Sequence, residues 1–179
     1  RRLRIHFPAL LIALVLLMLL AYPFVEARML SVQEHTLYVN GLPANLKNIR
    51  IVYASDIHQS RWFSQKRVDN VFRTINGLSA DLIVLGGDYA NDSNGAIDFF
   101  KHLPAINSRY GVYAVPGNHD RTTPESNLNQ LRAAMQTANV TPLINTVIPV
   151  RVGANAGSLE KNFLEKFPEA FFLILLGFV

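Results

Sequence analysis

Residues 111–120 read Gly-Val-Tyr-Ala-Val-Pro-Gly-Asn-His-Asp, and this stretch decides the fold class. An apolar run ends abruptly at Val115 in a turn that carries Asn118, His119 and Asp120. Two earlier segments share this design: residues 49–54 run into Ser55-Asp56-Ile57-His58, and residues 82–85 run into Gly86-Gly87-Asp88-Tyr89. Loops that leave the C-terminal ends of parallel strands form the ligand crevice of open α/β sheets. We therefore expect three buried strands that deliver polar side chains to one composite site.

Helical patterns separate these three strands. Residues 65–78 carry apolar side chains at three- and four-residue spacing, which is typical of a helix packed on a sheet. Residues 94–103 and 125–137 form the second and third expected helices, the last with Pro124 in its first turn. Further strands are expected at residues 35–39, 142–144 and 147–152. The alternation of strands and helices predicts an α/β fold with a parallel sheet.

Composition limits the class of protein. The 179 residues, half of them apolar, are enough for one domain with a sizeable core. The chain has no cysteine, which excludes disulfides and thiolate metal sites. Arg1, Arg2 and Arg4 supply three of the four net positive charges, so the rest of the chain is nearly neutral. A basic surface for nucleic acid is therefore not expected.

The N-terminal segment has the composition of a membrane-targeting sequence. Residues 7–25 form an uncharged run of 19 residues behind the arginines, close to the roughly 20 that span a bilayer. Arginines on one flank favour a cytoplasmic N-terminus, with the later residues outside the cytoplasm. The favoured interpretation is a single-pass anchor. The alternatives are a signal peptide, in which Pro23 breaks the helix before cleavage near Ala27 and the protein is secreted or periplasmic, and a buried core helix.

The side chains at the three strand ends are metal-binding and proton-transferring groups. Asp56 and His58 are two residues apart and can lie on the same side of an extended chain, where they could bind one ion such as manganese, iron or zinc. Asp88 could bridge two ions, although an isolated aspartate of this kind more often caps a helix or a turn. Asn118 offers a neutral oxygen, His119 can transfer a proton, and Asp120 can orient the imidazole.

In this order, Asp56-Ile57-His58, Gly87-Asp88 and Gly117-Asn118-His119-Asp120 closely resemble the motifs of the calcineurin-like metallophosphoesterase family, in the bacterial branch with an N-terminal membrane segment or export signal. The resemblance implies a two-sheet α/β sandwich around two divalent metal ions. By similarity, Asp56 and His58 would hold the first ion, Asp88 would bridge both, and Asn118 would bind the second. His119, paired with Asp120, would act near the leaving group.

The resemblance implies hydrolysis of a phosphoester, possibly lipid-linked or nucleotide-linked, by a hydroxide activated by two metal ions. No histidine follows His119, whereas members of the family supply further histidine ligands downstream. We therefore expect residues 1–30 to be the anchor or signal, residues 31–179 to be a phosphoesterase domain that is incomplete at its C-terminus, and the second metal site to bind weakly. The expected activity of the 179 residues is low. The alternative function is an inactive, membrane-anchored binding protein that retains part of a metal site.

Overall fold

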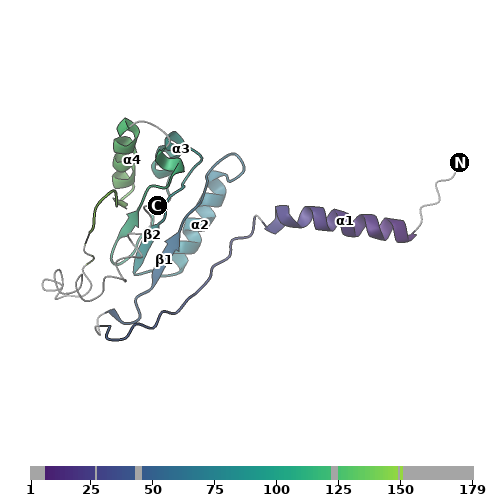
Figure 1. The fold of residues 1–179 in the computed structure, drawn as a ribbon, viewed down its shortest axis with the longest axis horizontal. Helices are drawn as coiled ribbons and strands as arrows, with labels where there is room; N and C mark the ends of the chain where they lie inside the picture. The colour runs from purple at the N-terminus through teal and green to yellow at the C-terminus, as the bar shows by residue number, and fades with distance from the viewer. Residues whose placement is uncertain (1–6, 27, 43–45, 122–124, 149, 151–179) are drawn as a thin grey trace. The chain divides into compact units, whose positions relative to one another are not determined.

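The computed structural model describes residues 7–26, 28–42, 46–121, 125–148 and 150. Contacts divide the chain into two compact units, Arg1–Val39 and Asn40–Val179, and each is described by itself. The helices and strands, in chain order, are α1 (Phe7–Glu26), β1 (Ile51–Ala54), α2 (Gln65–Gly77), β2 (Leu82–Leu85), α3 (Ser93–Lys101), β3 (Val112–Ala114), the 3-10 helix η2 (His119–Arg121), α4 (Glu125–Thr137) and β4 (Thr141–Pro142) (Figure 1).

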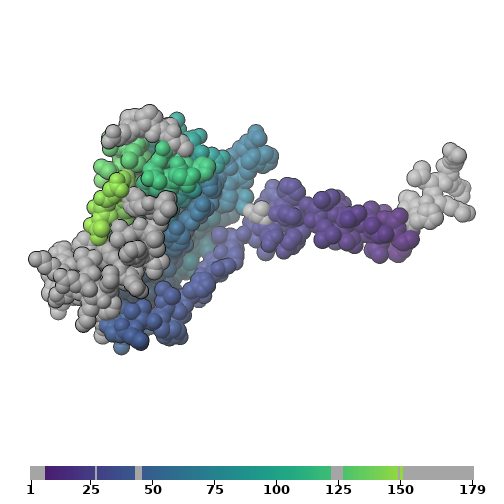
Figure 2. Space-filling model, in the orientation of Figure 1, coloured from purple at the N-terminus to yellow at the C-terminus, as the bar shows by residue number. Residues whose placement is uncertain are grey.

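The first unit contains the N-terminal helix. α1 is 20 residues long, and its length and composition are sufficient to cross a membrane. Every residue described in α1 is exposed (Figure 2). The expected break at Pro23 is wrong, because the helix continues through Pro23 to Glu26. A proline this close to a helix end removes one backbone hydrogen bond but leaves the preceding turns intact.

The second unit is built on a parallel sheet. Its strands lie in the order β1-β2-β3-β4, and each neighbouring pair is parallel. All four residues of β2, a central strand of this sheet, are buried. The predicted α/β fold with a strand-helix-strand-helix-strand order is confirmed.

The three helices α2, α3 and α4 share one hydrophobic core with one face of the sheet. Ile83 and Leu85 of β2 belong to this core, together with Phe72 of α2, Phe99 of α3 and Met135 of α4. Figure 1 shows the helices gathered along the sheet, with α3 against α4. The amphipathic spacing predicted for residues 65–78 is thus explained, because its apolar stripe faces this core.

Two expected strands are wrong within the described residues. Residues 35–39 form no strand, and neither do residues 147, 148 and 150, while residues 151 and 152 lie outside the described part. The strand expected at residues 142–144 begins one residue earlier and is shorter, as β4 (Thr141–Pro142). Just beyond it, the amide of Leu143 still donates to the carbonyl of Ala114 at 2.7 Å. The described residues contain one sheet of the sandwich that the resemblance implies.

Candidate metal centre

The predicted site residues lie at the edge of the sheet where the parallel strands end. Beyond β1, the chain stays hydrogen-bonded to the chain beyond β2. The amides of Asp56, His58 and Gln59 donate to the carbonyls of Gly87, Asp88 and Tyr89, at 3.0, 3.0 and 2.8 Å respectively. Main-chain hydrogen bonds are therefore sufficient to hold the Asp56–His58 loop against Asp88, without any side-chain contact.

Three candidate ligands have left-handed backbone conformations. The φ angles of Asp56, His58 and Asp88 are +56°, +47° and +55°. Such angles are uncommon for residues other than glycine and are least costly for aspartate, asparagine and histidine. Backbone of this kind is found preferentially at functional sites, where the surrounding structure holds it in place. Here the hydrogen bonds between the two loops hold these conformations in place. Because the backbone turns at each left-handed residue, the side chains do not alternate in direction as they would along a regular strand.

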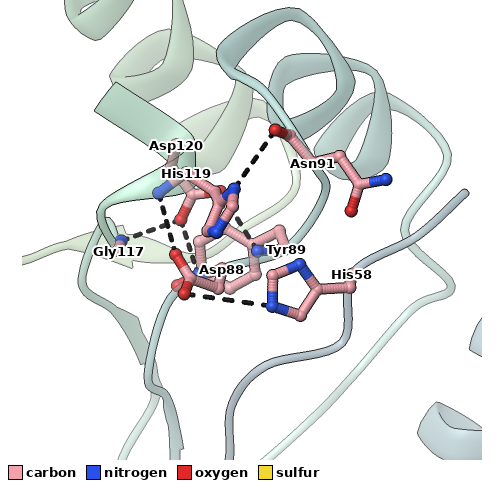
Figure 3. Close-up of polar contacts among 7 residues, drawn as sticks. All are labelled: His58, Asp88, Tyr89, Asn91, Gly117, His119 and Asp120. Atoms are coloured by element: carbon pink, nitrogen blue, oxygen red, sulfur yellow. Dashed lines mark hydrogen bonds and ion pairs between the residues drawn. The ribbon is translucent and has the colours of Figure 1, made fainter. Parts of the chain in front are cut away.

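His58, Asp88 and His119 form the cluster that could hold a metal ion. One potential ligand atom from each lies within 4.8 Å of the other two. Nε2 of His58 lies 4.0 Å from Oδ2 of Asp88, and the two imidazole rings meet edge to face with centroids 4.9 Å apart. Figure 3 shows the three side chains converging from three loops. Residues distant in the sequence are thus brought to one point by the parallel sheet.

The orientation of His119 is set by two contacts. Its amide donates to Oδ1 of Asp88 at 3.0 Å, and Nδ1 of its ring lies 3.3 Å from the carbonyl oxygen of Asn91 (Figure 3). If Nδ1 carries the hydrogen and donates to this carbonyl, Nε2 is free to bind a cation or to transfer a proton. Asn91 acts through its backbone, so no side-chain pattern in the sequence could have marked it.

Asp120 was expected to orient the imidazole of His119, and this pairing is wrong. Asp120 is only 1% exposed, and its two carboxylate oxygens accept hydrogen bonds from main-chain amides. The amides of Asp88 and Gly117 donate to Oδ2, each at 2.8 Å, and the amide of Tyr89 donates to Oδ1 at 3.1 Å. The carboxylate therefore joins the loops after β2 and β3. Burial raises the pKa of the Asp120 carboxyl, while the three amide hydrogen bonds act in the opposite direction.

Tyr89 joins the same two strand ends and was not singled out from the sequence. Its buried hydroxyl lies 2.7 Å from the carbonyl oxygen of Val115 and 3.0 Å from that of Leu85. Burial raises the pKa of Tyr89 well above its ordinary value, so the hydroxyl keeps its hydrogen and donates. Its ring packs on Phe99 and Phe100 of α3. Tyr89 thus connects the edge that bears the cluster to the core.

Two glycines allow the loops after β2 and β3 to touch. A Cβ on Gly87, where φ is +97°, would lie 2.5 Å from the amide nitrogen of Gly117. A Cβ on Gly117 would lie 2.5 Å from the amide nitrogen of Asp88 and would also collide with Oδ1 of that residue. The close approach of the two backbones therefore requires glycine at both positions.

Comparison with known proteins decides the family. Residues 49–171 match the family model described as calcineurin-like phosphoesterase. The chain belongs to the calcineurin-like phosphoesterase family. The part of the chain that matches the family includes all six of the predicted site residues: Asp56, His58, Asp88, Asn118, His119 and Asp120.

Similar proteins include membrane proteins and bacterial enzymes. The chain is 30% identical over 125 residues to a bovine transmembrane protein with a metallophosphoesterase domain, covering 69% of this chain and 27% of that protein. It is 31% identical to an uncharacterized metallophosphoesterase of Bacillus subtilis (54% and 35% covered). It is also 29% identical to a UDP-2,3-diacylglucosamine pyrophosphatase of Chlamydia muridarum (51% and 32% covered). The chain thus spans about a quarter to a third of the length of these relatives.

The donor set of this calcineurin-like phosphoesterase fits a divalent metal ion. Two ligand atoms that are each 2.0–2.2 Å from an ion are at most about 4.4 Å apart, so ligand atoms within 4.8 Å of one another require an adjustment of at most roughly half an ångström. Two imidazoles and a carboxylate suit manganese, iron or zinc. Asp56 and Asn118 are exposed at the same edge of the sheet, and Asp56 is not part of the cluster. Their roles as ligands stay predictions.

Proposed function

We propose that this protein hydrolyses a phosphoester in a metal-dependent reaction at a membrane. The observation that carries the proposal is the convergence of His58, Asp88 and His119 at the ends of three parallel strands. Membership of the family supports the class of reaction. The N-terminal helix α1 and the relatives named as transmembrane proteins support the membrane location.

The proposed reaction adds water across a P–O bond. The oxygen of water forms a bond to phosphorus, the bond from phosphorus to the leaving oxygen breaks, and the leaving oxygen takes up a proton. Divalent ions, when bound, would lower the pKa of water and neutralise charge on the phosphoryl group. We assign His119, with a hydrogen on each ring nitrogen, to donate the Nε2 proton to the leaving oxygen while Nδ1–H faces the carbonyl of Asn91. The proton that the attacking water loses balances the one that His119 gives up. The hydrogen bond from the His119 amide to Asp88 holds this residue beside the candidate ligands.

The proposed ligand assignment keeps Asp56 and His58 for a first ion, Asp88 for both ions, and Asn118 for a second. The left-handed conformations of Asp56, His58 and Asp88 support this assignment, because such backbone is found preferentially at functional sites and these three residues follow the ends of parallel strands. His119 is kept as the proton donor, and its ring lies beside that of His58, with centroids 4.9 Å apart. The substrate that we favour is a phosphoester carried by a lipid or a nucleotide. The name of the chlamydial relative, which acts on a nucleotide-linked acylated sugar, supports this class.

The experiment that tests this function is hydrolysis of bis-p-nitrophenyl phosphate by the full-length gene product in detergent, with Mn²⁺ added and with metal removed by a chelator. We expect turnover that depends on the metal and falls by about 10²- to 10⁴-fold in His119→Ala. His102→Ala is the matched control, because His102 is an exposed residue that caps the C-terminus of α3. Metal binding without turnover in the unaltered protein would instead support the inactive binding protein.

A further inference from the structure

A braced turn that follows His58 exposes the only tryptophan of the chain. Oγ of Ser60 accepts hydrogen bonds from the amides of Trp62 and Phe63, each at 3.3 Å, and the amide of Ser60 donates to the carbonyl of Phe63 at 3.1 Å. The backbone of the turn is thus held from within, yet the side chain of Trp62 is 76% exposed. Gln59, which begins this segment, pairs with Ala90 next to the candidate metal centre. The turn therefore belongs to the edge of the sheet that carries the site.

Two arginines contact residues of this turn, and a lysine follows it in the chain. The guanidinium carbon of Arg61 lies 4.9 Å from the centre of the Trp62 ring. Arg67 lies over the ring of Phe63 at 4.2 Å and donates from Nη1 to the carbonyl of Trp62 at 3.3 Å. Lys66 is exposed in the first turn of α2, and this first turn contains no acidic residue. We call Arg61, Trp62, Lys66 and Arg67 the Trp62 patch.

The chemistry of the Trp62 patch fits the interface of an anionic bilayer. Tryptophan places its apolar ring and its polar N–H at the level of lipid headgroups, and each nearby lysine or arginine strengthens binding to anionic lipid. The folded domain does not need this exposed ring for its core, since Phe63 and not Trp62 packs against the hydrophobic cluster. A nucleic-acid partner is disfavoured because the chain beyond its first residues is nearly neutral.

The chain also carries the means to keep this patch near a membrane. The helix α1 has the length and composition of a membrane span. The 24 residues between Glu26 and Ile51 can span at most about 85 Å when fully extended. A bilayer that holds α1 is therefore within reach of the domain. An anionic bilayer surface is the partner whose charge is complementary to the cationic Trp62 patch.

We propose that the Trp62 patch binds the headgroup region of an anionic bilayer and so presents the candidate metal centre to the membrane surface. Trp62 enters the interface, while Arg61, Lys66 and Arg67 contact lipid phosphates. It follows, on the basis of the proposed function, that the substrate is a phosphoester carried at the headgroup level of a lipid. The patch would then act as a contact for the membrane and would leave metal binding unchanged.

The single tryptophan makes the test direct, because the fluorescence of the full chain reports on Trp62 and not on α1. The protein is reconstituted into vesicles of phosphatidylcholine brominated on its acyl chains, alone or mixed with an equal part of phosphatidylglycerol. We expect a blue shift and strong quenching of Trp62 in the anionic vesicles, and much less in the zwitterionic vesicles. Arg61→Gln should weaken the association of the patch about five-fold, since one cation contributes about 1 kcal/mol at such a surface.

The matched control moves the tryptophan to another edge of the sheet. In Trp62→Phe combined with Tyr110→Trp, the new ring lies just before β3 and keeps an arginine above it, because Arg109 lies 5.2 Å from the centre of the Tyr110 ring. Quenching of the control as strong as that of the unaltered protein, or no quenching of Trp62 in either vesicle, would overturn the proposal. Binding of Mn²⁺ is measured on the same samples. Loss of quenching with intact Mn²⁺ binding rejects the membrane contact alone, whereas quenching without metal-dependent hydrolysis rejects the proposed function alone.

Discussion

Replacement of Gly117 by alanine should damage the candidate metal centre although it adds only a methyl group. The added Cβ would lie 2.5 Å from the amide nitrogen of Asp88 and 2.8 Å from Cγ, and would collide with Oδ1 of that residue. Comfortable contacts need about 3.5 Å, so the Asp88 loop must move by about 1 Å. This displacement also stretches the hydrogen bonds that Asp120 accepts from the amides of Gly117 and Asp88.

The expected effects can be stated separately for stability and for metal binding. Insertion of atoms into a tightly packed contact costs about 1–3 kcal/mol, which should lower the free energy of unfolding by that amount. A ligand displaced by about 1 Å no longer matches the geometry of its ion, and we expect affinity for Mn²⁺ or Zn²⁺ to fall about 10- to 100-fold. Urea denaturation and isothermal titration of the full chain in detergent measure the two quantities.

Gly77→Ala is the matched control, and it should raise the free energy of unfolding or leave it unchanged. Nothing lies within 4 Å of a Cβ added at Gly77, the last residue of α2. Alanine is favoured over glycine in a helix by about 0.5–1 kcal/mol, so this variant should be equally or more stable and should bind metal like the unaltered protein. If Gly117→Ala binds metal as tightly as Gly77→Ala, the close contact between Gly117 and Asp88 does not shape the site, and the reasoning is refuted.

Three further predictions address the site, its scaffold and its location. Asp88→Asn should reduce metal content more than Asp56→Asn or Asn118→Ala, because we assign Asp88 to both ions; elemental analysis that finds Asp88→Asn fully loaded would contradict this. Asp120→Ala should destabilise the protein by about 3 kcal/mol, because three main-chain amides lose their acceptor. Since the pKa of Asp120 is raised in the folded state, its titration contributes stability that is fully present below the unfolded pKa of about 3.9 and is lost as the pH rises through the folded pKa. The difference in free energy of unfolding between the unaltered protein and Asp120→Ala, measured by denaturation of chelator-treated samples, should therefore decrease as the pH rises. An increase with pH would contradict a raised pKa of Asp120 in the folded state. For location, an alkaline phosphatase reporter fused after Asp120 should be active, because α1 is predicted to place later residues outside the cytoplasm, and activity of a cytoplasm-only reporter at the same position would refute that topology.

The local pattern of apolar and polar residues was sufficient to predict most of the helices and strands. The apolar stripe of residues 65–78 predicted α2 to within one residue at its C-terminal end, and the buried run of residues 82–85 is β2 as predicted. The third predicted helix has the bounds of α4. The strand expected at residues 35–39 is wrong, because the strand propensity of one segment does not supply a partner strand. Pairing is a property of two segments, and a single segment does not contain it.

The candidate site divides in the same way. By itself, the sequence determined that metal-binding side chains follow three strands, because parallel strands bring their C-terminal ends to one edge whatever the details of the loops. Only the tertiary structure decided which side chains meet there: His119 lies with His58 and Asp88, and the backbone of Asn91 orients its ring. Only the tertiary structure showed that Asp120 binds three amides, since both the pairing with His119 and the structural role suit the same residue type. The physical reason is that residue type limits which bonds a side chain can make, whereas left-handed turns and glycine contacts between distant loops decide which partner lies within bonding distance.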